Sequence, residues 1–170
     1  MLLTEEQLSI QDMARRFAQE RLAPNAERWD RDHHYPADAI AEMAQLGFFG
    51  MLVPEEWDGN DSGYVSYAVA LEEIAAGNGA CSTIMSVHNS VGCMPILKYG
   101  SEAQKQRFLR PLAEGSMLGA FALTEPQAGS DASFLKTRAR RDGDHYVLNG
   151  AKQFITSGSH AGMVIVFAVT

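Results

Sequence analysis

The chain has 170 residues, of which 46% are hydrophobic and 21% are charged, and its formal net charge is −7. This composition is typical of a globular protein and excludes a disordered or low-complexity chain. The acidic balance argues against a nucleic-acid or anionic-membrane surface, and no uninterrupted apolar run is long enough to span a bilayer, so we expect neither partner.

The cysteines and histidines do not have the spacing of a metal site. Cys81 and Cys93 form no CxxC pattern, and the five histidines are scattered apart from the adjacent pair His33-His34. We therefore predict no metal and two buried free thiols, which is typical of a reducing compartment. The sequence starts with a helix-start pattern and not with a basic and apolar signal region, so we expect a cytoplasmic protein.

Several helix starts can be recognised in the first two thirds of the chain. Thr4–Gln7 and Ser101–Gln104 are capping boxes, in which a hydroxyl accepts from an early backbone amide and the Gln side chain reaches back. Pro24 and Pro36 suit the first turn of further helices, because the amide that proline lacks is not needed there. We expect Pro24 to interrupt the first helix and open a second one.

The middle of this region alternates between loop and helix. Residues 48–63 are rich in Gly, Asn, Asp and Pro, which predicts a loop, and Trp57 and the pair Phe48-Phe49 are expected to anchor it to the core. Apolar residues at helical spacing predict helices over 64–76 and 80–99. We interpret residues 1–117 as an N-terminal all-α domain.

Beyond Met117 the spacing changes to short apolar or alternating runs. The expected strands are 118–123, 135–141, 145–148, 151–156 and 163–169. Asp142-Gly143 is a turn signal, and Asn149-Gly150 is the strongest hairpin dipeptide, so the strand after it should pair back on the strand before it. The predicted class is α+β, with residues 118–170 as the start of an antiparallel β domain that this chain leaves incomplete.

The most informative stretch, Phe121–Asp131, joins a short apolar strand to a polar turn. Pro126 and Gly129 shape the turn, and Thr124 and Ser130 offer hydroxyls. The stretch has no Lys or Arg, so it suits a flat, mostly neutral group that needs directed hydrogen bonds better than a bare phosphate. From composition alone, the default interpretation is an ordinary turn between two strands.

Residues Ala122–Asp131 closely resemble the first signature of the acyl-CoA dehydrogenases. That signature is a small residue, an aliphatic residue, Ser or Thr, Glu, two free positions, a small residue, Gly, Ser or Thr, and Asp. Phe134 stands where the family usually has a small residue. Phe154–Thr156 is similar to the family's Trp-Ile-Thr, with Phe in place of Trp. Most of the 170 residues resemble the first half of such an enzyme.

The resemblance implies a flavoprotein that uses FAD and an acyl-CoA substrate. The cofactor-binding residues that it implies are Phe121, Leu123, Thr124, Phe154, Ile155 and Thr156. The substrate-binding residues that it implies are Ser130, at the CoA portion, and Ile84, Val87 and Val91, along the acyl tail. For the last three, core packing is the default interpretation of an apolar helical stripe.

The implied reaction is α,β-dehydrogenation of an acyl-CoA thioester, with electrons passed to an electron-transfer flavoprotein. The resemblance also implies a homo-oligomer, a tetramer or a dimer. The family's Glu base belongs to its C-terminal domain, so we expect no catalytic residue in this chain. Glu125 lies in the motif, but we expect it to hydrogen-bond its own turn, and we expect His88 and Asn89 to be satisfied helix residues.

The apolar strand Val164–Val169 ends the sequence with an open edge. The resemblance explains this edge, because it implies that the chain is the N-terminal portion of a longer enzyme, and we expect this portion to be inactive by itself. Two alternatives stay open: a non-catalytic helical interaction fragment, and an acyl-CoA oxidase or flavin monooxygenase of the same fold. The sequence does not define the length or branching of the acyl chain.

Overall fold

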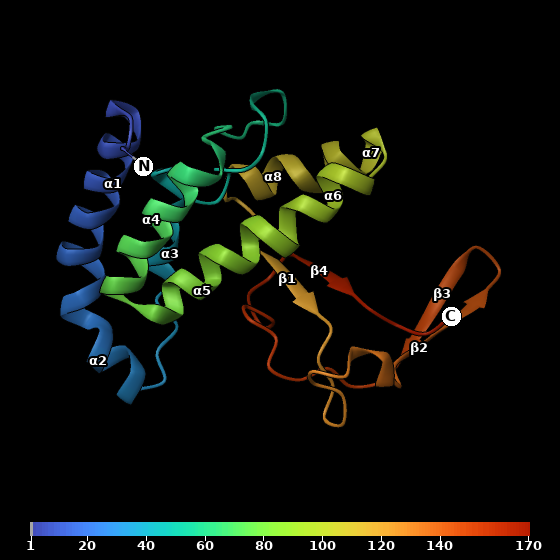
Figure 1. The fold of residues 1–170 in the computed structure, drawn as a ribbon. Coiled ribbons are helices and arrows are strands. Elements are labelled where there is room, and N and C mark those ends of the chain that lie inside the picture. The colour runs from blue at the N-terminus through green and yellow to red at the C-terminus, as the bar shows by residue number, and fades with distance from the viewer. Residues whose placement is uncertain (1) are drawn as a thin grey trace.

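The computed structural model describes residues 2–170 and shows a helical part followed by a small β part (Figure 1). The α-helices are α1 (Glu5–Phe17), α2 (Ala23–Arg31), α3 (Ala37–Gln45), α4 (Gly63–Gly77), α5 (Gly79–Val87), α6 (Met94–Tyr99), α7 (Glu102–Gln104) and α8 (Arg110–Ala113). The strands are β1 (Gly119–Ala122), β2 (Arg138–Asp142), β3 (His145–Asn149) and β4 (Met163–Val166). This order confirms the predicted helical domain followed by a β region.

Three π-helical segments join neighbouring helices into longer rods. These segments are η1 (Ala18–Leu22), η3 (His88–Cys93) and η4 (Lys105–Leu109), and short 3₁₀ turns lie at η2 (Glu55–Trp57) and η5 (Ala132–Phe134). The prediction for Pro24 is confirmed in part: α2 begins at Ala23 with Pro24 in its first turn, but η1 carries the chain from α1 into α2 without a break. The amide of Ala23 donates five residues back to the carbonyl of Ala18, and this wider turn accommodates the proline that follows.

Both predicted capping boxes are confirmed. The Thr4 hydroxyl accepts from the Gln7 amide at 3.2 Å, and the Gln7 side chain accepts from the Thr4 amide at 3.0 Å. Ser101 and Gln104 form the same reciprocal pair at the start of α7. These caps satisfy amides that the first turn of a helix leaves without a partner.

The core consists of two apolar clusters. The larger one lies among α1, α3, α4 and α5, where Phe48 and Phe49 are fully buried and the Phe17 ring meets Phe48 edge-on at 6.2 Å. The smaller cluster contains Trp57 and Leu112, and Met163 at the start of β4 packs against it. The loop residues Phe48, Phe49 and Trp57 therefore anchor to the core as predicted, and the smaller cluster connects the helical part to the β part.

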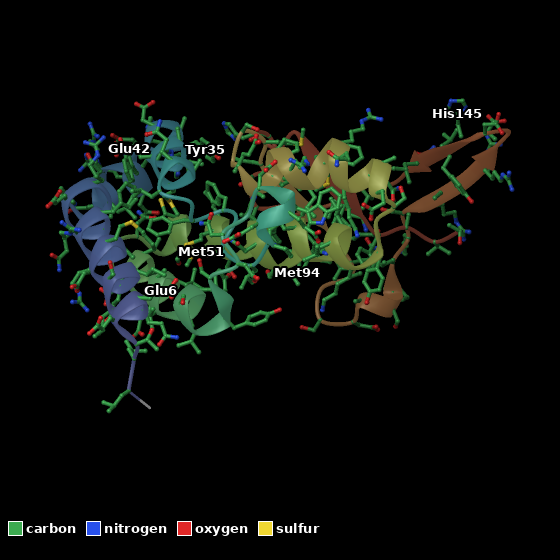
Figure 2. All side chains as sticks on the ribbon, turned by 90° about the horizontal axis from the view of Figure 1, so that it is seen from above. Glu6, Tyr35, Glu42, Met51, Met94 and His145 are labelled. Atoms are coloured by element: carbon green, nitrogen blue, oxygen red, sulfur yellow. The ribbon has the colours of Figure 1, made fainter. Side chains whose placement is uncertain are left out.

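The β part contains two separate pairs of strands. Strands β2 and β3 form an antiparallel hairpin at one end of the molecule, with His145 at its tip (Figures 1 and 2). Strands β1 and β4 pair in parallel, from Gly119 beside Met163 to Ala122 beside Val166. The antiparallel pairing that the sequence predicts is therefore present in the β2–β3 hairpin, whereas β1 and β4 pair in parallel. A parallel pair needs a long connection, and the hairpin and its flanking loops supply it.

The Asn149-Gly150 dipeptide does not form the expected hairpin turn, and residues 151–156 are not a strand. A Cβ added at Gly150 would lie 2.3 Å from Oγ1 of Thr137, so the glycine allows a close packing contact. The chain beyond it leaves the hairpin and runs along the end of β1. Tertiary packing therefore overrides the local turn preference of the dipeptide.

A buried histidine joins β1 to the helices. Nε2 of His88, in η3, donates to the carbonyl of Leu112 at 2.9 Å, and its Nδ1 accepts from the amide of Gly119 at 3.2 Å. Burial lowers the pKa of His88 to about 4, so the ring is neutral near pH 7. Beside it, a Cβ added at Gly119 would lie 3.3 Å from Cα of Gly92, so small residues allow η3 and β1 to pack closely.

No group of three or more His, Cys, Asp or Glu side chains within residues 2–170 could hold a metal ion. Both cysteines are free and buried. Within the same residues, the structure contains no helix with the length and apolar character to cross a membrane.

Candidate functional site

Two segments far apart in the sequence lie side by side at the end of β1. The amide of Gln153 donates to the carbonyl of Thr124 at 2.9 Å, and Nζ of Lys152 donates to the carbonyl of Leu123 at 2.9 Å. Residues 121–125 and 152–156 therefore form one continuous surface, which we call the two-segment wall. All six predicted cofactor-binding residues belong to this wall.

The side chains of the wall are open to ligands. Leu123, Thr124, Ile155 and Thr156 are half-buried, and Phe154 is 83% exposed. The hydroxyls of Thr124 and Thr156 have no hydrogen-bond partner among residues 2–170. The wall therefore presents apolar surface together with unused hydroxyls.

Phe121 lies on the partly buried side of the wall. Its ring meets that of Phe167 edge-on, with 5.2 Å between centroids and 61° between planes. This contact ties the end of β1 to the segment that follows β4. It leaves the Phe121 side chain half-buried, so only part of the ring is available to a ligand.

The backbone of the second segment is strained. Phe154 has φ of +58° and Ser157 has φ of +59°, in the left-handed region that bulky residues avoid. Such residues cost of order 1–3 kcal/mol each, and they cluster at sites where the surrounding structure fixes them for function. An exposed aromatic side chain held in this conformation supports a binding role for Phe154.

A buried carboxylate stabilises the turn next to the wall. Glu125, only 3% exposed, accepts from the amides of Lys136 at 2.7 Å and Thr137 at 2.9 Å. It also accepts from the Gln127 side chain at 2.6 Å and from Nζ of Lys152 at 2.9 Å. The structure confirms that Glu125 bonds its own turn, and it adds contacts to two more distant segments.

These contacts control the charge of Glu125. Burial raises the pKa of the carboxyl, but interactions with Thr137, Lys152 and the amide of Lys136 outweigh burial and hold the pKa well below its usual range. The group is therefore a carboxylate at neutral pH, and its oxygens are occupied by donors. Neither property suits a general base, which must be accessible and have a pKa near the working pH.

The predicted substrate residues on the helices differ in exposure. Ile84 belongs to the core cluster and is 8% exposed, so most of its surface is used in packing. Val87 and Val91 are half-buried on the rod formed by α5, η3 and α6, and η3 contacts β1. Val87 also lines a shallow groove between α4 and α5, together with Tyr67 and Leu71.

Ser130 lies at the exposed end of the turn that follows Glu125. Its neighbour Asp131 caps the short 3₁₀ turn η5 by accepting from the amide of Ser133 at 3.2 Å. Gly129 has open space around it, with no atom within 4 Å of an added Cβ. Ser130 is thus accessible to a ligand that approaches this turn.

The two polar residues beside the valine stripe are satisfied structural residues, as predicted. His88 makes the two contacts described above. The Asn89 side-chain amide donates to the carbonyls of Phe48 at 2.8 Å and Met85 at 3.0 Å. Both side chains are fully buried and make structural contacts.

Sequence reasoning missed two parts of the site. Lys152 lies in a segment that the sequence predicts as a strand, and its ion pair with Glu125 joins residues too far apart in the sequence for a local pattern to reveal. The second part is Tyr35, whose ring stacks on His160 with 3.7 Å between centroids and 8° between planes. Tyr35, labelled in Figure 2, comes from the loop between α2 and α3, and no local pattern predicts its contact.

The chain matches two models of one protein family. The family model described as acyl-CoA dehydrogenase, N-terminal domain, matches residues 4–116, and the one described as acyl-CoA dehydrogenase, middle domain, matches residues 120–170. The chain belongs to the acyl-CoA dehydrogenase family.

Individual relatives cover the whole chain. An acyl-CoA dehydrogenase of Bacillus subtilis is 44% identical over 170 residues, which are 100% of this chain and 45% of that protein. The butyryl-CoA dehydrogenase structure from Megasphaera elsdenii has a TM-score of 0.94 and 40% identity, again covering 100% of this chain and 45% of that one. The chain thus spans about 45% of the length of the relatives that it matches.

Two further structures concern flavin and electron transfer. A chain of a structure described as the electron transferring flavoprotein of Acidaminococcus fermentans has a TM-score of 0.95 and 44% identity, covering 100% of this chain and 45% of that one. A glutaryl-CoA dehydrogenase from Mycobacterium smegmatis, solved in complex with FADH2, has a TM-score of 0.92 and 37% identity. The match covers 98% of this chain and 43% of that one.

Proposed function

We propose that this chain forms the helical part and one flavin-binding wall of an FAD-dependent acyl-CoA dehydrogenase, which removes hydrogen from the α and β carbons of an acyl-CoA thioester. The observation that carries the proposal is the hydrogen bond from Gln153 to Thr124. It brings both predicted cofactor segments into one surface with free hydroxyls. Membership of the acyl-CoA dehydrogenase family supports the same activity.

The residues of the wall fit a flavin ring. A planar heterocycle with polar atoms along one edge needs directed donors there and apolar contacts on its faces. Thr124 and Thr156 supply hydroxyls, while Leu123, Ile155 and the exposed Phe154 ring supply apolar surface. When bound, FAD accepts the hydride that leaves the β carbon of the acyl chain.

The same proposal assigns roles to the substrate residues. We assign Ser130 to the CoA portion, because its turn is exposed and unobstructed at Gly129. Val87 and Val91 are assigned to the acyl tail, since they are half-buried on a rod that contacts β1. Ile84 supports this face from within the core and adds little contact of its own.

The proton acceptor lies outside the residues of the wall in this proposal. Glu125 is the buried carboxylate of the motif, but its low pKa and its four donors assign it to structure. The resemblance places the family's Glu base in the C-terminal domain.

We further propose that the enzyme passes its electrons to an electron-transfer flavoprotein, that it assembles as a homotetramer, and that it works in the cytoplasm. The electron acceptor is supported by the likeness to a chain of the Acidaminococcus fermentans structure. The tetramer rests on the family resemblance. The cytoplasmic location is supported by the two free cysteines, which are typical of a reducing compartment.

Flavin spectroscopy of the enzyme that contains this chain tests the activity. We expect the purified enzyme to show flavin absorbance, and butyryl-CoA added without oxygen should bleach it as the flavin is reduced. A colourless enzyme that takes up no added FAD would support the non-catalytic alternative. A reduced flavin that oxygen reoxidises rapidly would indicate an oxidase or monooxygenase, and the dehydrogenase proposal would be wrong.

A further inference from the structure

Lys152 is a nearly buried cation at the junction of the two wall segments. Its side chain is 12% exposed, and its Nζ donates to two acceptors of the other segment, the carbonyl of Leu123 and Oε1 of Glu125, each at 2.9 Å. The proposed function assigns no role to this side chain.

A role in stability alone does not explain the arrangement well. Burying an ammonium and a carboxylate costs desolvation free energy, and a well-packed apolar pair is often as stable as a buried ion pair. What the charged pair adds is direction, because each charge-assisted hydrogen bond fixes where its partner points. Here one of the fixed partners is the Leu123 carbonyl, a backbone group of the wall itself.

The orientation of that carbonyl determines the next amide. A trans peptide unit is planar, so the N–H of Thr124 points opposite to the C=O of Leu123. The Thr124 amide has no hydrogen-bond partner among residues 2–170. The following peptide is fixed as well, because the Thr124 carbonyl accepts from Gln153 and the Glu125 amide donates to Ala128 at 3.0 Å. Lys152 thus directs an unused backbone donor away from itself.

We propose that Lys152 is a positioning residue of the two-segment wall: by holding the Leu123 carbonyl and the Glu125 carboxylate together, it aims the Thr124 amide at the polar edge of the bound ring. The identity of the ring rests on the proposed function. The positioning of the backbone by Lys152 does not depend on which ligand binds. An experiment can therefore contradict the proposed function without contradicting the role of Lys152, and the reverse.

Three variants of the complete enzyme test the role of Lys152. Lys152→Met keeps the length of the side chain and removes the ammonium. Adding Glu125→Gln to it removes the partner's charge too, so no unpaired charge stays buried. Lys98→Met is the matched control, because Lys98 is exposed on α6. The readouts are FAD release after dilution, thermal stability of the apoprotein, and hydrogen exchange in the apoprotein of a peptide that contains the Gln153 amide.

We expect Lys152→Met to release FAD at least about tenfold faster, which corresponds to one charge-assisted hydrogen bond. The Gln153 peptide should also exchange faster in the apoprotein, and Lys98→Met should match the wild type in all three readouts. The double variant should keep the fast FAD release, since the Leu123 carbonyl still lacks its donor. Its thermal stability should stay low, because the amide group that replaces one Glu125 oxygen faces the backbone amide of Lys136 or Thr137. A role confined to charge balance would instead restore wild-type FAD release in the double variant.

Two results would overturn the inference. One is a double variant with wild-type FAD release. The other is a Lys152→Met enzyme whose FAD release and Gln153 exchange are unchanged. A wild-type enzyme that binds no FAD would contradict the proposed function, and in that case exchange at Gln153 in the variants still decides whether Lys152 positions the wall.

Discussion

Thr124 combines two donors at one position of the wall, a hydroxyl and a backbone amide, and neither has a partner among the described residues. We expect Thr124→Val to weaken FAD binding by about 1–3 kcal/mol, because a polar atom of the ring would be left without its partner. Titration calorimetry of the apoenzyme with FAD measures the change. Thr83→Val is the control, since the Thr83 hydroxyl bonds the carbonyl of Gly79 within its own helix. Equal affinity in Thr124→Val and wild type would exclude the assigned contact.

His88 makes stability depend on pH. Its folded pKa of about 4 lies below the ordinary value of 6.5, so the unfolded chain binds the proton more readily. The contribution of neutral His88 to the free energy of unfolding is therefore complete above pH 6.5 and is lost as the pH falls toward 4. We expect the free energy of unfolding to decrease by about 2 kcal/mol between pH 7 and pH 5.

Denaturant unfolding of wild type and His88→Gln at both pH values measures this decrease. The variant should be less stable at pH 7 but should lose less stability on acidification. The carboxyl of Glu125 does not interfere, because its lowered pKa means that its stabilising contribution is present above its ordinary pKa of 4.5 and is lost only at lower pH. Parallel pH profiles of the two proteins would show that His88 is not the titrating group.

At the scale of the elements, the sequence offers two dipeptides that could close a hairpin, and packing decides which of them does so. Asp142-Gly143 closes the β2–β3 hairpin as the sequence predicts, with Asp142 opposite His145. Asn149-Gly150 has the stronger local preference, yet it ends the hairpin. Gly150 is required there for the contact with Thr137, which the sequence does not reveal.

Gly150→Ala should therefore destabilise the protein by about 1–3 kcal/mol, the usual cost of forcing extra volume into a packed contact. Gly129→Ala is the control, because a Cβ at Gly129 would meet no atom within 4 Å and should change stability by less than about 0.5 kcal/mol. Thermal or denaturant unfolding measures both. Equal stability of the two variants would mean that the Thr137 contact is not tight in solution.

At the scale of the whole molecule, the helical and β parts share packing. Met163 of β4 packs on the cluster that contains Leu112 of α8, and His88 holds both Leu112 and Gly119. Tyr35 stacks on His160 just beyond the second segment of the wall. The helices thus hold the start of β1, the start of β4 and the loop that follows the wall.

Local patterns predicted much of this molecule but not its long-range contacts. Capping boxes, helical spacing and the family signature identified the helical part, the β region and the residues of the wall. The parallel pairing of β1 with β4 and the role of Lys152 could not be predicted, because both depend on contacts between segments more than 25 residues apart. The π-helical turn that joins α1 to α2 could not be predicted either, because such a turn has no simple sequence signal.

A crystal structure of the complete enzyme with FAD bound is the most direct test of the two-segment wall. The account predicts that the isoalloxazine ring lies against residues 121–125 and 152–156, with the hydroxyls of Thr124 and Thr156 within hydrogen-bond distance of its polar atoms. A flavin bound elsewhere, or a ring that contacts only one of the two segments, would contradict it.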